Sequence, residues 1–177
     1  MNKIINPELI KKILDHLNKK EFDFALERIQ DLSIQFPNDL TLNKLFASTY
    51  FKKSDWHNSI KYNKKILVNG KDKYLTYINI GVAYFKLGEI NKSIEAYKKS
   101  IEDNPNFEMT YNNLAISYIE IGLYEDAFNN FLTDGFLLCL FDKRFDDRKG
   151  DICFQQCATN VLESRLNVIV SKTTYAA

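Results

Sequence analysis

The sequence predicts an all-α solenoid of helix hairpins followed by a C-terminal extension. Within residues 74–107, apolar side chains recur at i, i+3, i+4 and i+7 in two consecutive stretches, which is the pattern of two amphipathic helices. Leu87-Gly88 separates the stretches and Pro105 follows the second, as expected for a turn and a helix end. The same pattern returns before and after this segment at a fixed interval, which we call the repeat step. Stacked hairpins of this kind form a solenoid.

Residue size also recurs at the repeat step. The small residues are Ala47, Gly81 and Ala115, and the tyrosines that recur with them are Tyr50, Tyr84 and Tyr118. Two helices of a hairpin approach closely only where one of them carries a small side chain, and aromatic rings fill the space around the crossing. We therefore expect Gly81 to lie at a helix crossing, with Tyr84 and Tyr118 as equivalent fillers between helices.

In these features the chain resembles the tetratricopeptide repeat family, whose unit is a helix-turn-helix of about 34 residues. The central copy has the family's residue types, in order, at Tyr77, Ile80-Gly81, Tyr84, Leu87-Gly88, Ser93, Tyr97 and Pro105. The next copy has them at Tyr111, Leu114-Ala115, Tyr118, Ile121-Gly122 and Ala127. The resemblance implies a right-handed superhelical solenoid.

The first repeat, residues 6–39, is predicted to diverge from the others. Asn6 is suited to cap its first helix and Pro7 to occupy the first helical position. Lys12, His16 and Lys20 stand where Leu, Tyr and Gly are expected. A terminal repeat has solvent on one side, so relaxed core positions are expected there.

Three further repeats follow the first. The second, residues 40–73, lacks a closing proline and has Asn43 and Asn63 where aromatic residues are expected. The third is the central copy, residues 74–107. The fourth, residues 108–133, is predicted to be truncated because Asp134 and Gly135 interrupt its second helix. The array is therefore assigned to residues 1–133.

Residues 134–177 form a non-repeat C-terminal extension. Three of the four arginines and all three cysteines lie in it, and residues 153–170 have one apolar face that fits a candidate capping helix. Two interpretations fit the extension: a cap over the apolar end of the array, or an end that is truncated or out of register with the parent gene.

Composition argues against nucleic acids and membranes as partners. The 177-residue chain has a net charge of +1, and its lysines are scattered over the predicted outer helix faces. No stretch is long and apolar enough for a membrane span or a signal peptide. We therefore expect a cytoplasmic protein.

Catalytic and metal-binding motifs are missing from the sequence. There is no phosphate-binding loop, nucleophile elbow or His-Glu-x-x-His motif. The histidines, His16 and His57, lie in unrelated settings, and Cys153 and Cys157 have no neighbouring histidine with which to bind zinc. We expect no enzyme activity, no cofactor and no metal site.

The resemblance implies a binding groove on the concave side, lined by the first helix of each hairpin. The predicted groove residues are Lys44, Ser48, Phe51, Ile78, Asn79, Val82, Phe85, Lys86, Asn112, Asn113, Ile116 and Ile119. Lys52, Leu75, Met109 and Glu120 are expected beside them. Lys44 and Asn79 match the family's carboxylate clamp for peptide C-termini, whereas Ser48, Met109 and Asn113 depart from it, so a clamp is not predicted.

These features predict a protein–protein interaction scaffold that binds a peptide or helix of a partner in the concave groove. An amphipathic helix suits the mainly apolar strip, and the chain's own residues 153–170 are the nearest candidate. The alternative is a repeat module that precedes the catalytic domain of a larger enzyme, such as a glycosyl- or sulfotransferase, and is truncated here. A third hypothesis is self-association through the open end of the array.

Overall fold

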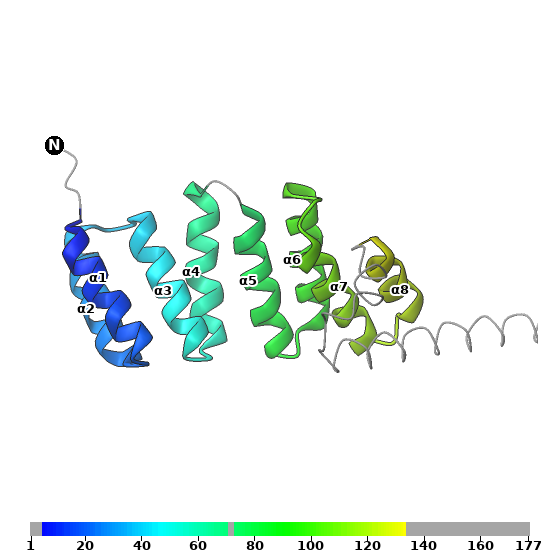
Figure 1. Ribbon diagram of the computed structural model, residues 1–177, viewed down its shortest axis with the longest axis horizontal. Coiled ribbons are helices and arrows are strands. Elements are labelled where there is room, and N and C mark those ends of the chain that lie inside the picture. Colours follow the sequence, from blue (N-terminus) through cyan, green and yellow to red (C-terminus); the bar gives the residue numbers. More distant parts are fainter. Residues whose placement is uncertain (1–4, 71–72, 134–177) are drawn as a thin grey trace, which may run out of the picture.

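The computed structural model describes residues 5–70 and 73–133, and this part of the chain is the all-α solenoid that the sequence predicts. It contains eight helices and no strand, and the helices follow one another in chain order along the long axis of the array (Figure 1). The helices are α1 (Pro7–Asn18), α2 (Phe22–Gln35), α3 (Leu40–Lys52), α4 (Trp56–Asn69), α5 (Lys73–Lys86), α6 (Ile90–Asp103), α7 (Glu108–Glu120) and α8 (Tyr124–Thr133). The proposed capping helix at 153–170 lies outside the described residues.

The first helix begins as the sequence predicts. Asn6 Oδ1 accepts a hydrogen bond of 2.9 Å from the backbone N–H of Glu8, and Pro7 is the first helical residue. At the other end of α1, His16 lies 2.6 Å from a carboxylate oxygen of Glu21, and Lys12 is exposed. The exposed surface of α1 is therefore mixed, since Leu9 and Leu14 on the same helix are 40% and 44% exposed, and its core positions are relaxed as expected for a terminal repeat.

One backbone conformation recurs at the turn of every hairpin. Lys20, Ser54, Gly88 and Gly122 follow one another at the repeat step and have φ angles of 62°, 61°, 75° and 77°. This left-handed conformation lets the chain reverse direction between two helices, and it suits glycine because glycine has no Cβ. The prediction of such a turn at Gly88 is confirmed, and Lys20 adopts the same turn although it is not glycine.

Ser54→Gly should stabilise the protein by about 0.5–1 kcal/mol. A residue with a side chain loses about 1–2 kcal/mol in the left-handed conformation, and the greater freedom of glycine in the unfolded chain offsets part of the gain.

Gly88→Ala should lower the free energy of unfolding by about 1 kcal/mol, because alanine is disfavoured in the left-handed conformation. No atom lies within 4 Å of a Cβ placed there, so a steric clash does not contribute. Urea denaturation measures both changes, and a less stable Ser54→Gly protein would contradict the backbone explanation.

Gly81 lies at a close helix crossing, as predicted. A Cβ atom added to Gly81 of α5 would lie 2.5 Å from Cε1 and 2.8 Å from Cζ of Tyr97 on α6. Tyr97 is buried in an apolar cluster of α5–α8, and this burial raises the pKa of its phenol to about 12. The absence of a side chain at Gly81 makes room for this ring.

The equivalent crossing in the second repeat has one larger and one smaller residue. Ala47 of α3 takes the place of Gly81, and Asn63 of α4 takes the place of Tyr97. Asn63 is buried, and its amide nitrogen donates a hydrogen bond of 2.9 Å to the carbonyl oxygen of Ser59. The two crossings thus divide the available volume differently between the two helices.

The aromatic ring missing at Asn43 is supplied from a different position. Tyr62 of α4 stacks on Phe46 of α3 with ring centroids 4.4 Å apart, and on Tyr50 at 5.6 Å. In the central repeat the residue that corresponds to Tyr62 is Ala96, which has no ring. The second repeat therefore keeps an aromatic core despite Asn43.

Candidate peptide-binding groove

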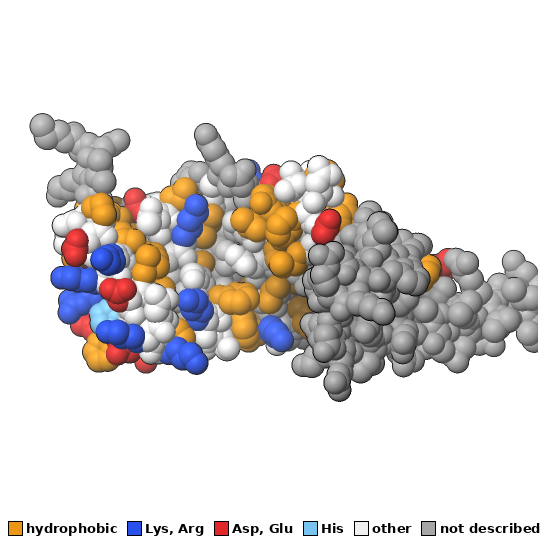
Figure 2. All heavy atoms as spheres, in the orientation of Figure 1, with side chains coloured by type: hydrophobic (Ala, Val, Ile, Leu, Met, Phe, Trp, Pro, Cys, Tyr) orange, Lys and Arg blue, Asp and Glu red, His pale blue; other side chains and the backbone are white. Residues whose placement is uncertain are grey.

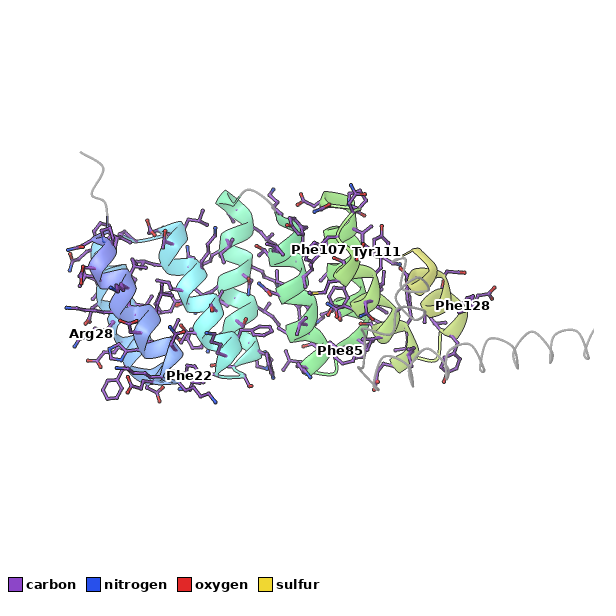
Figure 3. The ribbon with its side chains drawn as sticks, viewed as in Figure 1. Phe22, Arg28, Phe85, Phe107, Tyr111 and Phe128 are labelled. Atoms are coloured by element: carbon purple, nitrogen blue, oxygen red, sulfur yellow. The ribbon has the colours of Figure 1, made fainter. Side chains whose placement is uncertain are left out.

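The predicted groove residues are carried by α3, α5 and α7, the first helices of three successive hairpins. Figure 2 shows hydrophobic side chains gathered over α5 and the adjoining part of the array, whereas Lys and Arg side chains lie mainly toward α1 and α3. Phe85 lies near the end of α5, while Phe107 and Tyr111 lie at the start of α7 (Figure 3).

The apolar part of the candidate groove consists of equivalent residues of α5 and α7. Leu75 and Met109 occupy the same position in successive repeats and are 47% and 58% exposed. Four further side chains on the same two helices are half-buried: Val82, Phe85, Ile116 and Ile119. Val82 and Ile119 also pack against the apolar core cluster. We call these six residues the apolar strip.

Ile78 is a correction to the predicted site. Its side chain is only 6% exposed and belongs to the core cluster with Ile94 and Leu114. The prediction that it lines an exposed strip is therefore wrong. Helical spacing places Ile78 on the correct side of α5, but the neighbouring helices close over it.

Polar residues surround the apolar strip. Lys44, Ser48, Asn79, Lys86, Lys52 and Glu120 are exposed, and Asn112 and Asn113 are half-buried. Lys44, Lys52 and Lys86 form no ion pair with any residue in the described part of the chain. Exposed charges of this kind orient a ligand more than they strengthen its binding.

Phe51 contributes less to the groove than its position suggests. Its ring contacts Trp56 edge to face, with centroids 5.3 Å apart and an interplanar angle of 83°. Because both rings are half-buried, this pair fills the junction of α3 and α4. The apolar strip is therefore centred on α5 and α7.

A second feature, which the sequence analysis missed, lies on the opposite face of α5. Tyr77, Ile80 and Tyr84 share that face by helical spacing and line a hollow of about 330 Å³ with Lys64, Leu67, Lys92, Glu95, Ala96 and Lys99. We call it the α5/α6 hollow. The hydrogen bond from Lys92 to Glu89 raises the pKa of Lys92.

A similar hollow occurs one repeat earlier. The α3/α4 hollow, of about 240 Å³, is lined by Gln30, Ser33, Phe36, Pro37, Asn38, Asp39, Leu42, Asn43, Phe46, Tyr62 and Lys65. At the repeat step, Asn43, Phe46 and Lys65 correspond to Tyr77, Ile80 and Lys99. These correspondences lie outside the aromatic and glycine positions that define the repeat. They are the sequence signal from which the hollows could have been predicted.

Residues 5–70 and 73–133 were also compared with the requirements of a metal site and of a membrane-spanning helix. No group of three or more His, Cys, Asp or Glu side chains there is placed to hold a metal ion. None of the helices described is long and apolar enough to cross a membrane.

The chain was compared with protein-family models, curated protein sequences and solved structures. The TPR repeat family model matches residues 81–130. No curated protein sequence matches the chain. Among solved structures, MamA from Desulfovibrio magneticus RS-1 is similar with a TM-score of 0.69 and 16% identity over 78% of this chain and 78% of that chain.

Two further solved structures have the same fold. The TPR2B domain of yeast Sti1, in complex with pHsp70, is similar with a TM-score of 0.59 and 23% identity over 68% of this chain and 96% of that chain. Cut9 in the APC/C Cut9–Hcn1 hetero-tetramer is similar with a TM-score of 0.67 and 17% identity over 84% of this chain and 29% of that chain. At these identities the likeness shows the fold.

Proposed function

From its membership of the tetratricopeptide repeat family, we infer that this chain is a scaffold that binds a protein partner. The apolar strip on α5 and α7 carries the inference. Leu75 and Met109 are exposed at equivalent positions of two stacked hairpins, so they present apolar surface side by side. A contiguous exposed apolar surface on a domain usually marks an interaction site.

The ligand we propose is an amphipathic helix of a partner protein. The strip combines exposed ends, Leu75 and Met109, with half-buried side chains such as Val82 and Ile116 farther along the same helices. A helix with apolar residues at i, i+3, i+4 and i+7 presents a stripe of matching width. Lys44 and Lys86 on one side and Glu120 on the other would set its orientation.

Leu75→Glu with Met109→Glu should abolish most of this binding. Helical peptides selected by phage display against the full chain should lose at least about tenfold in affinity, because two charges would be placed against an apolar ligand face. Fluorescence anisotropy measures the affinity. Both side chains are exposed, so circular dichroism and thermal melting should stay close to those of the parent protein.

The matched control is Ile34→Glu with Val68→Glu. These residues of α2 and α4 are 76% and 77% exposed and lie off the strip, and the charge change is the same. Selected peptides should bind this control as they bind the parent protein. Equal loss in both double variants, or no loss in either, would show that the strip is not the site. A synthetic peptide of residues 153–170 belongs in the same assay as a candidate ligand from the chain itself.

A further inference from the structure

The outer face of α4 is the most basic helix surface in the described part of the chain. Lys61, Lys64 and Lys65 are exposed, and α4 contains no Asp or Glu. None of the three lysines forms an ion pair with a residue that the structure describes. By contrast, α2 carries a single cation, Arg28, and three acidic residues, Asp23, Glu27 and Asp31. The positive charge of α4 is therefore local and uncompensated.

Aromatic rings hold these lysines in place. The ammonium groups of Lys61 and Lys65 lie 5.7 and 4.8 Å from the centroid of the Tyr62 ring, and that of Lys64 lies 5.9 Å from the centroid of Tyr84. Attraction between a cation and a ring face favours these positions. The three charges are thus partly ordered before any ligand binds, which lowers the entropic cost of binding one.

The two hollows lie on either side of α4 and each takes a lysine from it. Lys65 lines the α3/α4 hollow with Tyr62, whose pKa is raised by burial and by Tyr50, so its phenol stays neutral. Lys64 lines the α5/α6 hollow together with Lys92 and Lys99. Lys92 is paired with Glu89, so the positive charge of this second hollow comes from Lys64 and Lys99 against the one acidic lining residue, Glu95.

Asn43 in the α3/α4 hollow has a buried side-chain amide, and a buried amide is ordinarily hydrogen-bonded. The residue is 7% exposed and lines the hollow, yet its side-chain amide makes no hydrogen bond with any residue in the part of the chain that the structure describes. A buried amide without a partner is destabilising by about 1–3 kcal/mol, and such groups are uncommon in folded proteins. An amide with free N–H groups beside the Lys65 ammonium suits an oxygen acceptor from a ligand.

We propose that the outer face of α4, with the hollows on either side of it, binds an acidic peptide segment. One carboxylate of the segment enters the α3/α4 hollow and accepts hydrogen bonds from the Asn43 amide and the Lys65 ammonium. A second carboxylate meets Lys64 and Lys99 at the α5/α6 hollow. This surface is separate from the apolar strip, so the scaffold would hold two partner segments of different chemistry.

The surroundings favour a peptide over a nucleic acid. A nucleic acid binds through a continuous row of phosphates and needs a basic track of matching length. Here the basic face of α4 is flanked on one side by the acidic α2, and α6 carries Glu95, Glu102 and Asp103 among its lysines. A few carboxylates on separate side chains can meet the lysines of the two hollows singly, and each hollow has one acidic residue in its lining, Asp39 or Glu95. Asp39 Oδ1 already accepts hydrogen bonds from the backbone N–H groups of Thr41 and Leu42.

Titration of the full chain with a fluorescein-labelled poly-glutamate peptide tests the proposal. We expect saturable binding that weakens as salt is added, and no binding of a neutral glycine-serine peptide. Lys64→Glu with Lys65→Glu should weaken binding by about tenfold or more, which corresponds to about 1.4 kcal/mol. Lys11→Glu on α1 with Lys19→Glu directly after that helix makes the same change in net charge at exposed sites away from both hollows and should leave binding nearly unchanged. Equal weakening in the two variants would overturn the proposal, because binding would then follow net charge alone.

Asn43→Leu separates a ligand-binding role from a structural one. Removal of an amide without a partner should raise the melting temperature of the free protein and weaken binding of the acidic peptide several-fold. Unchanged peptide binding would overturn the role of the α3/α4 hollow.

Tighter binding of a poly-thymidylate oligonucleotide than of poly-glutamate would overturn the choice of a peptide. The Leu75→Glu, Met109→Glu protein should bind poly-glutamate normally, so failure of the groove proposal would not affect this test.

Discussion

Gly81→Leu is expected to lower the free energy of unfolding by about 3 kcal/mol or more, as measured by urea denaturation. Even the first carbon of the new side chain would overlap the Tyr97 ring, whose Cε1 is 2.5 Å from the ideal Cβ position. Tyr97 is buried and packed in the core cluster, so its ring has little room to move. Leucine has a better helix propensity than glycine by about 1 kcal/mol, which is too small to offset the clash.

A double-mutant cycle identifies Tyr97 as the source of this effect. Gly81→Ala alone should be destabilising, whereas in a Tyr97→Asn background its cost should fall by at least about 1 kcal/mol. The double substitution would have the same residue pair that the second repeat has at Ala47 and Asn63, with Ser93 in the place of Ser59. Additive effects of the two substitutions would show that Gly81 is needed for a reason other than the Tyr97 ring.

Tyr118→Ala is expected to cost about 3–5 kcal/mol, a large share of the stability of a typical domain. Tyr118 is buried among Leu114, Ala115 and Tyr97, and its removal leaves a cavity between α6 and α7. Tyr84→Ala, the equivalent change one repeat earlier, should cost less because Tyr84 is half-buried and faces the α5/α6 hollow.

Thermal melting of the two tyrosine variants measures the difference directly. Tyr118→Phe is the control, because it keeps the ring and should retain most of the stability. Equal losses for Tyr84→Ala and Tyr118→Ala would contradict the different burial of the two rings. A small loss for Tyr118→Ala would contradict the packing of α6 against α7.

Sequence periodicity predicted those parts of the fold that depend on spacing along the chain. The all-α solenoid and the crossing at Gly81 follow from residue size and type at the repeat step, because each repeat packs in nearly the same way as the next. The turn at Gly88 follows from the backbone freedom of glycine. Such features need only local patterns and a repeated geometry.

Features that depend on compensation between helices were not predicted. Asn43 was recognised as a departure, but periodicity gave no indication that Tyr62 would supply the missing ring, because that requires the packing of α4 on α3. Ile78 was placed on the correct helix face, yet its burial depends on α6 and α7. Apart from Ile78, the predicted groove residues of α5 and α7 have exposed or half-buried side chains, and the groove itself stays a prediction. The hollows beside α4 depend on residues from three helices.

Packing in this array is almost entirely between neighbours. Among the helices described, each packs mainly against the next one in the chain, and α5 with α7 is the principal pair that skips a helix. Contacts close in sequence favour fast folding, and nearest-neighbour coupling lets the ends of an array open without unfolding its centre. Amide hydrogen exchange should therefore be slowest in α5 and α6 and faster in α1 and α2. A pulling force applied to the two ends would therefore unfold and extend the chain one hairpin at a time.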